Sequence, residues 1–247
     1  MNKTAIHFFM GLMLVLIAGW QGWKEVKAQG ADWLPVKYVR IEGTFQYIAK
    51  DEIKQLLREQ VVNGFYNADI QQIQISVEAL PWVKSAMVKR VWPDAINIEV
   101  REQTPVARWG SDALLNTKGR IFKPNKLNNF NLLPLLSGPN GYEVKMLKVV
   151  TDLSAELAEQ GMALAEFHIN ERRAWNIKLQ NKMLLNAGRN QPLKKIQRFL
   201  KTVYLLGKEQ IAKIAVVDLR YSNGYAITWK QGEAKVNWKK IAEMNKT

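Results

Sequence analysis

Leu80 to Trp109, with the sequence LPWVKSAMVKRVWPDAINIEVREQTPVARW, carries the clearest structural pattern in the chain. Around Ala86 to Val88, and again from Ile96 to Arg101, apolar and polar residues alternate, which is the pattern of strands with one buried face. Pro81 ends the helical pattern that comes before them, because a residue preceding proline disfavours helical backbone. Trp92-Pro93-Asp94 makes the turn between the two strands. The stretch therefore predicts a helix end, a strand, a turn and a second strand, followed by a break.

Upstream of this stretch, the sequence predicts one strand and two helices. Val36 to Gly43 has strand character and closes on glycine. Ile48 to Val61 carries apolar residues at helical spacing, and Asn63-Gly64 ends that helix. Asn67 can cap a second helix, whose apolar face is spaced from Ile70 to Leu80. The order strand, helix, helix, strand, strand is satisfied by a small sheet with two helices on one face.

A second region follows Thr104-Pro105, with two predicted helices among short, mixed segments. Glu143 to Gln160 is helical, and Gly161 suits its end. Pro192 opens another helix that runs through Leu206. The residues expected to point inward from the first helix are Val144, Leu147, Val150, Leu153 and Leu157. Short strands or apolar runs are expected at Leu114 to Thr117, Arg120 to Phe122 (with Lys118-Gly119 as a hairpin turn), Leu132 to Leu136, Phe167 to Asn170, Trp175 to Leu179 and Met183 to Asn186.

The second region closes with a predicted hairpin. Ile214 to Tyr221 and Tyr225 to Lys230 flank Ser222-Asn223-Gly224, and Asn-Gly between alternating strands is a good hairpin signal. This hairpin would set Arg220 and Tyr221 on one arm against Trp229 on the other. A last strand is an edge that can accept another strand, and Tyr, Trp and Arg are frequent anchors of interfaces. Ordinary packing of a terminal hairpin would explain the same residues.

The N-terminus contains an apolar stretch. No Asp, Glu, Lys or Arg occurs from Thr4 to Trp23, which is roughly the length that a helix needs to cross a bilayer. Trp20 and Trp23 fit an interfacial aromatic anchor. Two interpretations remain open from the residues alone. One is an uncleaved signal-anchor, and the other is a signal peptide cleaved near Val26-Lys27-Ala28.

The composition limits the classes of function. There are 36 basic and 22 acidic residues, which gives a net charge of +14, and there is no cysteine. This balance favours anionic partners such as nucleic acid, lipid headgroups or acidic proteins, but the basic residues are scattered and favour a solvated basic surface. Disulfides and cysteine nucleophiles are excluded.

Little in the sequence supports catalysis or nucleic-acid binding. The two histidines are His7, in the apolar stretch, and His168, alone in a predicted strand. No zinc-binding His-Glu-x-x-His pattern and no phosphate-binding glycine loop occurs. A cell-wall glycosidase stays open, since a fold could bring scattered carboxylates together. Aromatic residues could stack on bases, but core packing is the preferred interpretation for them. These aromatic residues are Trp109, Trp175, Tyr221 and Trp229.

Several motifs resemble the FtsQ family of cell division proteins, called DivIB in Gram-positive bacteria. Three of them lie in the opening stretch: Leu80-Pro81-Trp82-Val83, Trp92-Pro93-Asp94 and Pro105 to Trp109. The others are Glu171-Arg172-Arg173-Ala174-Trp175, Asn186-Ala187-Gly188-Arg189 and Val217-Asp218-Leu219-Arg220-Tyr221. The resemblance covers nearly everything from the apolar stretch to Trp229, and it favours the signal-anchor because the family keeps its single membrane span.

The resemblance implies an α+β fold with a single N-terminal transmembrane helix, a βααββ POTRA domain, and a mixed β domain with two helices and a C-terminal edge hairpin. The expected organisation is a short cytoplasmic tail (1–4), a transmembrane signal-anchor (5–23), a linker (24–35), the POTRA domain (36–104), the β domain (105–231) and a basic tail (232–247).

The resemblance also implies partners and a site. In the family, the last hairpin receives FtsB in complex with FtsL, and the key tyrosine and tryptophan correspond to Tyr221 and Trp229. The flanking arginine corresponds to Arg220 and the turn glycine to Gly224. A further arginine falls in the pair Arg172-Arg173, of which Arg173 is favoured. Ser222 and Asn223 belong to the expected site, although relatives often carry Asp-Ser there, and Tyr225 stands where small residues are common.

The function implied is that of a non-enzymatic scaffold of the bacterial divisome. It would link early and late division proteins at the septum, single-pass in the inner membrane with its bulk in the periplasm. FtsW, FtsI, FtsK and FtsA are further expected partners. Neither cofactor, metal, nucleic acid nor small-molecule substrate is expected. The alternative is a POTRA-bearing envelope chaperone or transport component, although the region after Thr104 is too short and too helical for a pore of many strands.

Overall fold

The computed structural model describes Met13 and residues 35–62, 64–127 and 130–232. The chain divides into two compact units, Met1–Gln103 and Thr104–Thr247. Apart from Met13, the predicted membrane span at 5–23 lies outside the described residues, as do most of the linker and nearly all of the basic tail. No helix within the described part of the chain is long and apolar enough to cross a membrane.

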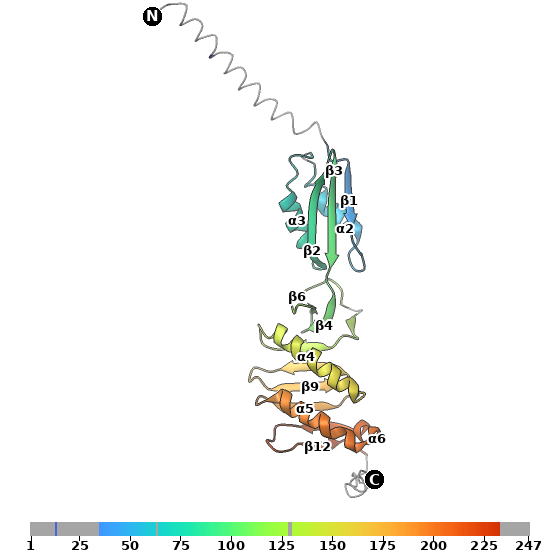
Figure 1. The fold of residues 1–247 in the computed structure, drawn as a ribbon, viewed down its shortest axis with the longest axis vertical. Coiled ribbons are helices and arrows are strands. Elements are labelled where there is room, and N and C mark those ends of the chain that lie inside the picture. Colours follow the sequence, from blue (N-terminus) through green and yellow to red (C-terminus); the bar gives the residue numbers. More distant parts are fainter. Residues whose placement is uncertain (1–12, 14–34, 63, 128–129, 233–247) are drawn as a thin grey trace, which may run out of the picture. The chain divides into compact units, whose positions relative to one another are not determined.

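The first unit has the predicted order of strand, helix, helix, strand and strand (Figure 1). Its described elements are β1 (Tyr38–Glu42), α2 (Lys50–Leu57), α3 (Ile70–Glu78), β2 (Val83–Val91) and β3 (Ala95–Glu102). The sheet has the order β1-β3-β2, with β1 parallel and β2 antiparallel to β3. This confirms the predicted arrangement, in which the last two strands form a hairpin around Trp92-Pro93-Asp94.

The core of the first unit lies between one face of the sheet and the two helices. Ile96 and Ile98 of β3 are fully buried, as are Ile53 of α2 and Ile73 of α3. The alternation seen in the sequence therefore separates a buried face from a solvated one.

The predicted cap of the second helix is wrong by two residues. Asp69, and not Asn67, caps α3, since its carboxylate accepts hydrogen bonds from the N–H groups of Gln71 and Gln72 at 2.9 and 3.0 Å. Asn67 lies in the preceding turn, where burial of Ala68 fixes the path of the chain. Both residue types are good caps, so the sequence alone could not separate them.

The second unit is a mixed sheet with helices. Its described strands have the order β12-β11-β10-β9-β8-β7-β4-β5-β6. The strands are β4 (Pro105–Trp109), β5 (Ala113–Asn116), β6 (Ile121–Phe122), β7 (Leu135–Ser137), β8 (Leu164–Ile169), β9 (Trp175–Leu179), β10 (Leu184–Gly188), β11 (Ile214–Asp218) and β12 (Ala226–Trp229). The helices are α4 (Glu143–Glu159), α5 (Pro192–Val203) and α6 (Lys208–Ala212), with the 3-10 turn η2 (Tyr204–Leu206) between the last two. The mixed α+β class is confirmed, whereas α6 was not predicted.

Helices α4 and α5 both cross the sheet on the face turned toward the viewer in Figure 1. Leu153 of α4 and Phe199 of α5 are buried in one cluster with Phe167, Ile177 and Leu185 of the strands. The sheet and both helices therefore share one core, which fixes α5 against the end of the sheet that carries β11 and β12.

The predicted inward face of α4 is correct for three of its five residues. Val150, Leu153 and Leu157 are buried, but Val144 is exposed and Leu147 is half-buried. Met146 and Val149 are the other buried residues of the helix. Val144 lies in the first turn against the hairpin glycine, where a Cβ placed on Gly119 would come within 2.9 Å of Val144 Cγ2. Val144 thus contacts a loop and not the core, whereas Met146 of the same turn belongs to the core.

Candidate protein-binding edge

Strand β12 forms one edge of the nine-stranded sheet. It pairs antiparallel with β11, and no strand among the described residues lies on its other side. The N–H of Lys230 donates to the carbonyl oxygen of Lys213 at 2.9 Å. Main-chain groups of an antiparallel strand alternate between its two sides, so those of Ile227 and Trp229 face away from β11. The edge therefore presents main-chain donors and acceptors that another strand could use.

The hairpin differs in shape from the one that the sequence predicts. β11 ends at Asp218, so Tyr221 lies in the connecting loop and not on a strand. Trp229 pairs with Ile214, at the opposite end of β12 from this loop. The prediction that Arg220 and Tyr221 stand across from Trp229 is therefore wrong. Three strand steps between Ala226 and Trp229 put about 10 Å of strand between the loop and the tryptophan.

Asp218 and Asn186 cause the early end of β11. The Asp218 carboxylate accepts a hydrogen bond from the N–H of Arg220 at 3.0 Å, which turns the chain. The N–H of Leu219 donates to the carbonyl oxygen of Asn186 at 2.9 Å, and so remains bound toward β10. Both bonds direct the chain away from β12 before Tyr221 is reached.

The two aromatic residues of the predicted site differ in burial. Tyr221 is 57% exposed, so most of its ring is available to a partner. Trp229 is half-buried and packs against the main core cluster of the second unit. Tyr221 therefore contributes little to the packing of the fold, whereas Trp229 is part of it.

Helix α5 fixes the loop that carries Tyr221. The Arg198 guanidinium donates to the carbonyl oxygens of Ser222 at 2.7 Å and Gly224 at 3.2 Å. Lys195 Nζ donates to the carbonyl oxygen of Arg220 at 3.0 Å. These charge-assisted bonds satisfy loop carbonyls that no strand pairs with, so the loop has a defined shape before any partner arrives.

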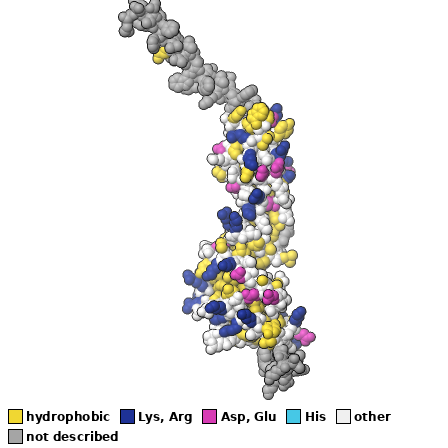
Figure 2. All heavy atoms as spheres, in the orientation of Figure 1, with side chains coloured by type: hydrophobic (Ala, Val, Ile, Leu, Met, Phe, Trp, Pro, Cys, Tyr) yellow, Lys and Arg dark blue, Asp and Glu magenta, His cyan; other side chains and the backbone are white. Residues whose placement is uncertain are grey.

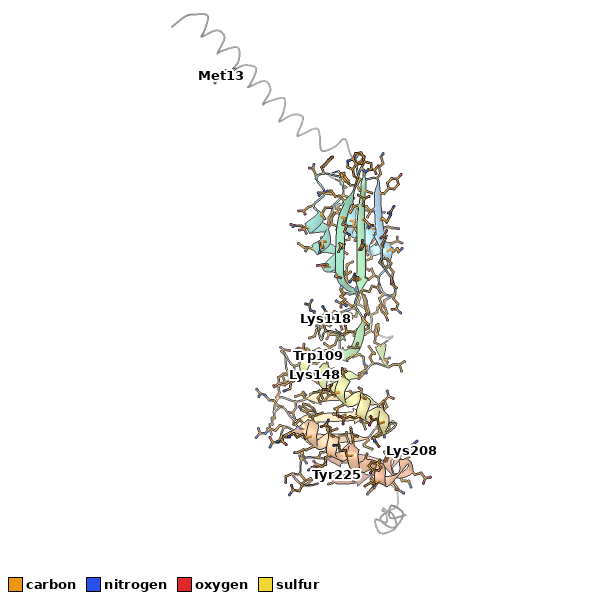
Figure 3. The ribbon with its side chains drawn as sticks, viewed as in Figure 1. Met13, Trp109, Lys118, Lys148, Lys208 and Tyr225 are labelled. Atoms are coloured by element: carbon orange, nitrogen blue, oxygen red, sulfur yellow. The ribbon has the colours of Figure 1, made fainter. Side chains whose placement is uncertain are left out.

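Tyr225 completes this attachment (it is labelled in Figure 3). Its hydroxyl lies 2.8 Å from Thr202 Oγ1, and its ring packs edge-to-face on Phe199 at 5.3 Å between centroids. Tyr225, which stands where small residues are common in the family, therefore packs under α5 and does not project from the edge.

Arg220 is held by its neighbour two residues earlier. Its Nε donates to both carboxylate oxygens of Asp218, at 2.9 and 3.0 Å, and its Nη2 donates at 2.6 Å. These hydrogen bonds lower the pKa of Asp218 and raise that of Arg220. The Arg220 side chain stays 68% exposed and passes over Gly188, where an added Cβ would come within 3.3 Å of Arg220 Cγ. Arg220 is thus a charged, oriented group beside the loop.

Arg173 lies at the same end of the sheet as Arg220. It is in the turn between β8 and β9, with a φ of 60° and its N–H donating to the carbonyl oxygen of Asn170 at 2.8 Å. Arg172 and Arg173 line a hollow of about 460 Å³ with Glu171, Arg189 and Asn190. Arg189 and Asn190 also line a hollow of about 820 Å³ that contains Arg220 and Ser222. The two hollows connect the predicted arginines through Arg189.

The structure adds residues that the sequence did not suggest for this site. The larger hollow is also lined by Lys194, Lys195 and Arg198 of α5. Their spacing was a usable signal, because residues three and four apart lie on one face of a helix. The expected site is therefore brought together only in part. Arg173, Arg220, Tyr221, Ser222, Asn223 and Gly224 lie at one end of the sheet, and Trp229 lies at the other end of β12.

No catalytic constellation accompanies this edge in the described residues. Ser137 Oγ lies 2.8 Å from His168 Nδ1, but the cross-strand neighbour of His168 is Asn176, and no carboxylate is recorded on its ring. No group of three or more metal-binding side chains occurs in the part of the chain that the structure describes. The geometry of the β12 edge supports binding of a partner strand.

Comparison with known proteins identifies two domains. Residues 34–103 match the family model of the FtsQ-type POTRA domain, and residues 107–220 match that of the FtsQ/DivIB C-terminal domain. The chain is 45% identical to the cell division protein FtsQ of Methylomonas methanica over 96% of both chains. It is 36% identical to FtsQ of Shewanella oneidensis (83% of this chain, 78% of the relative) and 32% identical to FtsQ of Escherichia coli (88% and 80%).

Proposed function

The chain belongs to the FtsQ/DivIB family of cell division proteins, and from this we propose that it captures the FtsB–FtsL complex by adding a partner strand to β12. It acts as a non-enzymatic divisome scaffold that links early and late division proteins. A signal-anchor over 5–23 holds it in the inner membrane at the septum, with the POTRA domain (36–104) and the β domain (105–231) in the periplasm.

The observation that carries this proposal is the position of β12 at the edge of the sheet, with no strand beyond it among the residues that the structure describes. Its outward main-chain groups at Ile227 and Trp229 provide the affinity of strand addition, and the side chains around them provide the specificity. Tyr221 supports the same docking mode, since it is an exposed aromatic residue on a loop held by Arg198 and Lys195. A fixed loop loses little conformational entropy on binding, which favours affinity.

The charges beside the edge select the partner. Arg173 and Arg220 line connected hollows with Arg189. A partner strand that carries carboxylates on the segment passing this end of the sheet would gain charge-assisted hydrogen bonds. We assign Arg220 and Arg173, with Ser222, Asn223 and Gly224 of the loop, to the partner-binding surface.

The test is binding of the soluble part, Val36–Thr247, to the extracytoplasmic segment of FtsB–FtsL. Titration calorimetry would compare the unchanged chain with the double variant Tyr221→Ala/Trp229→Ala. Tyr204→Ala is the matched control, because Tyr204 is 58% exposed and lies on η2, outside the predicted site. We expect binding by the unchanged chain and the control, and none by the double variant.

Circular dichroism must show that the double variant is folded. Binding retained by a folded double variant would remove the site assignment. Binding by none of the three proteins would refute capture of FtsB–FtsL and leave family membership standing.

A further inference from the structure

The exposed apolar side chains of the first unit gather at one of its ends. Among residues 35–62 and 64–103, eight large apolar side chains are more than a third exposed, and five of them belong to this end. The five are Tyr38 (66%), Val62 (77%), Tyr66 (55%), Val91 (43%) and Trp92 (76%). We call them the apolar tip. Figure 2 shows hydrophobic side chains at the end of this unit where β1 starts.

Strand pairing places three members of the apolar tip together. In the register, Tyr38 of β1 and Val91 of β2 both face Ala95 of β3. Tyr38 and Val91 lie on the sheet face away from the helices, because Val39 and Val88 belong to the residues packed in the core. Trp92 directly follows Val91 in the turn, so the row continues into the most exposed tryptophan of the described residues.

Arg90 attaches the other two members to the same end. Its guanidinium donates to the carbonyl oxygens of Phe65 at 3.0 Å, Tyr66 at 3.2 Å and Ala68 at 2.6 Å. This fixes the segment between α2 and α3 beside the end of β2. Tyr66 and Val62 therefore belong to one surface with Trp92, although some 26 to 30 residues separate them along the chain.

The charges at this end cancel. Lys37 pairs with Asp94 at 3.4 Å, and Asp69 caps α3. The positive charges of Arg58 and Arg90 are balanced by the negative charges of Glu59 and Asp69. A surface of tryptophan, tyrosine and valine without net charge matches the composition of membrane–water interfaces and offers little to an anionic polymer.

The course of the chain toward the N-terminus indicates which partner covers this surface. β1 begins at Tyr38, so the chain enters the unit at the apolar tip, and fourteen residues (24–37) separate Tyr38 from the end of the uncharged stretch Thr4–Trp23. Fourteen extended residues span at most about 50 Å, so a membrane anchor in that stretch keeps the tip within about 50 Å of the bilayer and raises its local concentration there.

From these observations we propose that the apolar tip of the first unit docks on the lipid bilayer, with Trp92, Tyr66 and Tyr38 at the level of the headgroups. This inference rests on the proposed membrane anchor. Docking would hold the POTRA domain against the membrane and limit the directions in which it can present its other surfaces to partners. Because the tip carries no net charge, docking does not require anionic lipid.

The chain contains no cysteine, so a single introduced thiol reports one position. A nitroxide on Val62→Cys would be measured in the full chain in nanodiscs, through its collision rates with oxygen and with a soluble nickel complex. The same label on Thr44→Cys is the control, because Thr44 is exposed and follows the opposite end of β1. We expect lipid-like accessibility at position 62 and water-like accessibility at position 44.

A second pair of variants assigns the effect to the apolar tip. Trp92→Ser/Tyr66→Ser should shift the label at position 62 to water-like accessibility. Ile75→Ser/Met87→Ser removes two other exposed apolar side chains, 60% and 49% exposed, and should leave it unchanged. The result should be the same in phosphatidylcholine alone and with phosphatidylglycerol added.

Three results would overturn the proposal. One is water-like accessibility at position 62 in the unchanged nanodisc sample. The second is lipid-like accessibility at position 62 that appears only with phosphatidylglycerol. Shielding of this position from the nickel complex that appears only when a protein partner is added would count equally against the proposal. The third is a chain that fails to co-purify with nanodiscs, which would refute the anchor itself and is distinguished by gel filtration before any label is read.

Discussion

At the level of single residues, the side chains of the expected binding site differ in how much they are buried. Tyr221 is mostly exposed in a loop, and Trp229 is half-buried against the core. Arg220 is oriented by Asp218, and this pair is local, since the two residues are two apart in the chain. Side chains of the same expected site therefore have different physical roles.

We predict that Tyr221→Ala and Trp229→Ala differ in their effect on folding. Tyr221→Ala should change the free energy of unfolding by less than about 0.5 kcal/mol, as exposed positions do. Trp229→Ala should lower it by about 1–3 kcal/mol, since it removes part of a packed side chain. Urea unfolding of Val36–Thr247 measures both. Equal effects of the two substitutions would contradict the burial that distinguishes them.

The Asp218–Arg220 pair predicts a pH dependence. Hydrogen bonds from Arg220 lower the pKa of Asp218 in the folded state below its unfolded value, which is about 3.9. The pair therefore stabilises the fold at pH above about 4, and this contribution is lost as the pH falls through the lower, folded pKa. The gap in urea midpoint between the unchanged chain and Asp218→Asn should narrow from pH 6 to pH 3. Asp152→Asn, at an exposed position of α4, is the control. A gap that stays constant would contradict the assignment.

At the level of elements, α5 holds the loop that carries Tyr221 in a defined shape. Its basic residues donate to loop carbonyls, and Phe199 and Thr202 hold Tyr225 from the same helix. The loop that replaces a tight turn is thus stabilised by a helix and not by strand pairing.

We predict that Arg198→Met loosens this loop while α5 remains formed. Amides of Ser222 to Tyr225 should exchange hydrogen at least about tenfold faster, because loss of charged hydrogen bonds costs about 1.5–3 kcal/mol. Affinity for FtsB–FtsL should fall with it. Lys201→Met on the same helix is the control, since Lys201 is exposed. Unchanged exchange in the Arg198 variant would show that other contacts hold the loop.

The sequence predicts elements better than it predicts their ends. Alternation at Ile96 to Arg101 and helical spacing in α4 identify both elements, because the spacing of apolar residues along the sequence marks the face that is buried. The ends depend on contacts distant in sequence. Arg198 reaches across 24 residues to Ser222, and Leu219 bonds to Asn186, so no local pattern shows that β11 stops at Asp218. The same reason explains why the hollow between α5 and Arg220 was not foreseen.

At the scale of the whole molecule, the two units have separate cores. Ile98 belongs to one buried cluster and Phe199 to the other. Family models likewise match the two regions separately. The proposed capture of FtsB–FtsL by the second unit should therefore be open to alteration without disturbing the core of the first unit.

We predict two thermal transitions that respond to different substitutions. Ile98→Ala should lower the midpoint temperature of one transition and Phe199→Ala that of the other. Each substitution should reduce the free energy of unfolding of its unit by about 2–5 kcal/mol, since both side chains are fully buried. Differential scanning calorimetry of Val36–Thr247 measures this. One transition that shifts with both substitutions would contradict separate cores.

Pairing of a partner strand with β12 can be measured by hydrogen–deuterium exchange of the β12 amides. In the free protein, the amides of Ile227 and Trp229 face away from β11 and should exchange quickly, whereas that of Thr228 should be protected. Addition of the extracytoplasmic FtsB–FtsL segment should slow exchange at Ile227 and Trp229 in particular. A complex that forms without new protection of these two amides would contradict strand addition and place the partner on another surface.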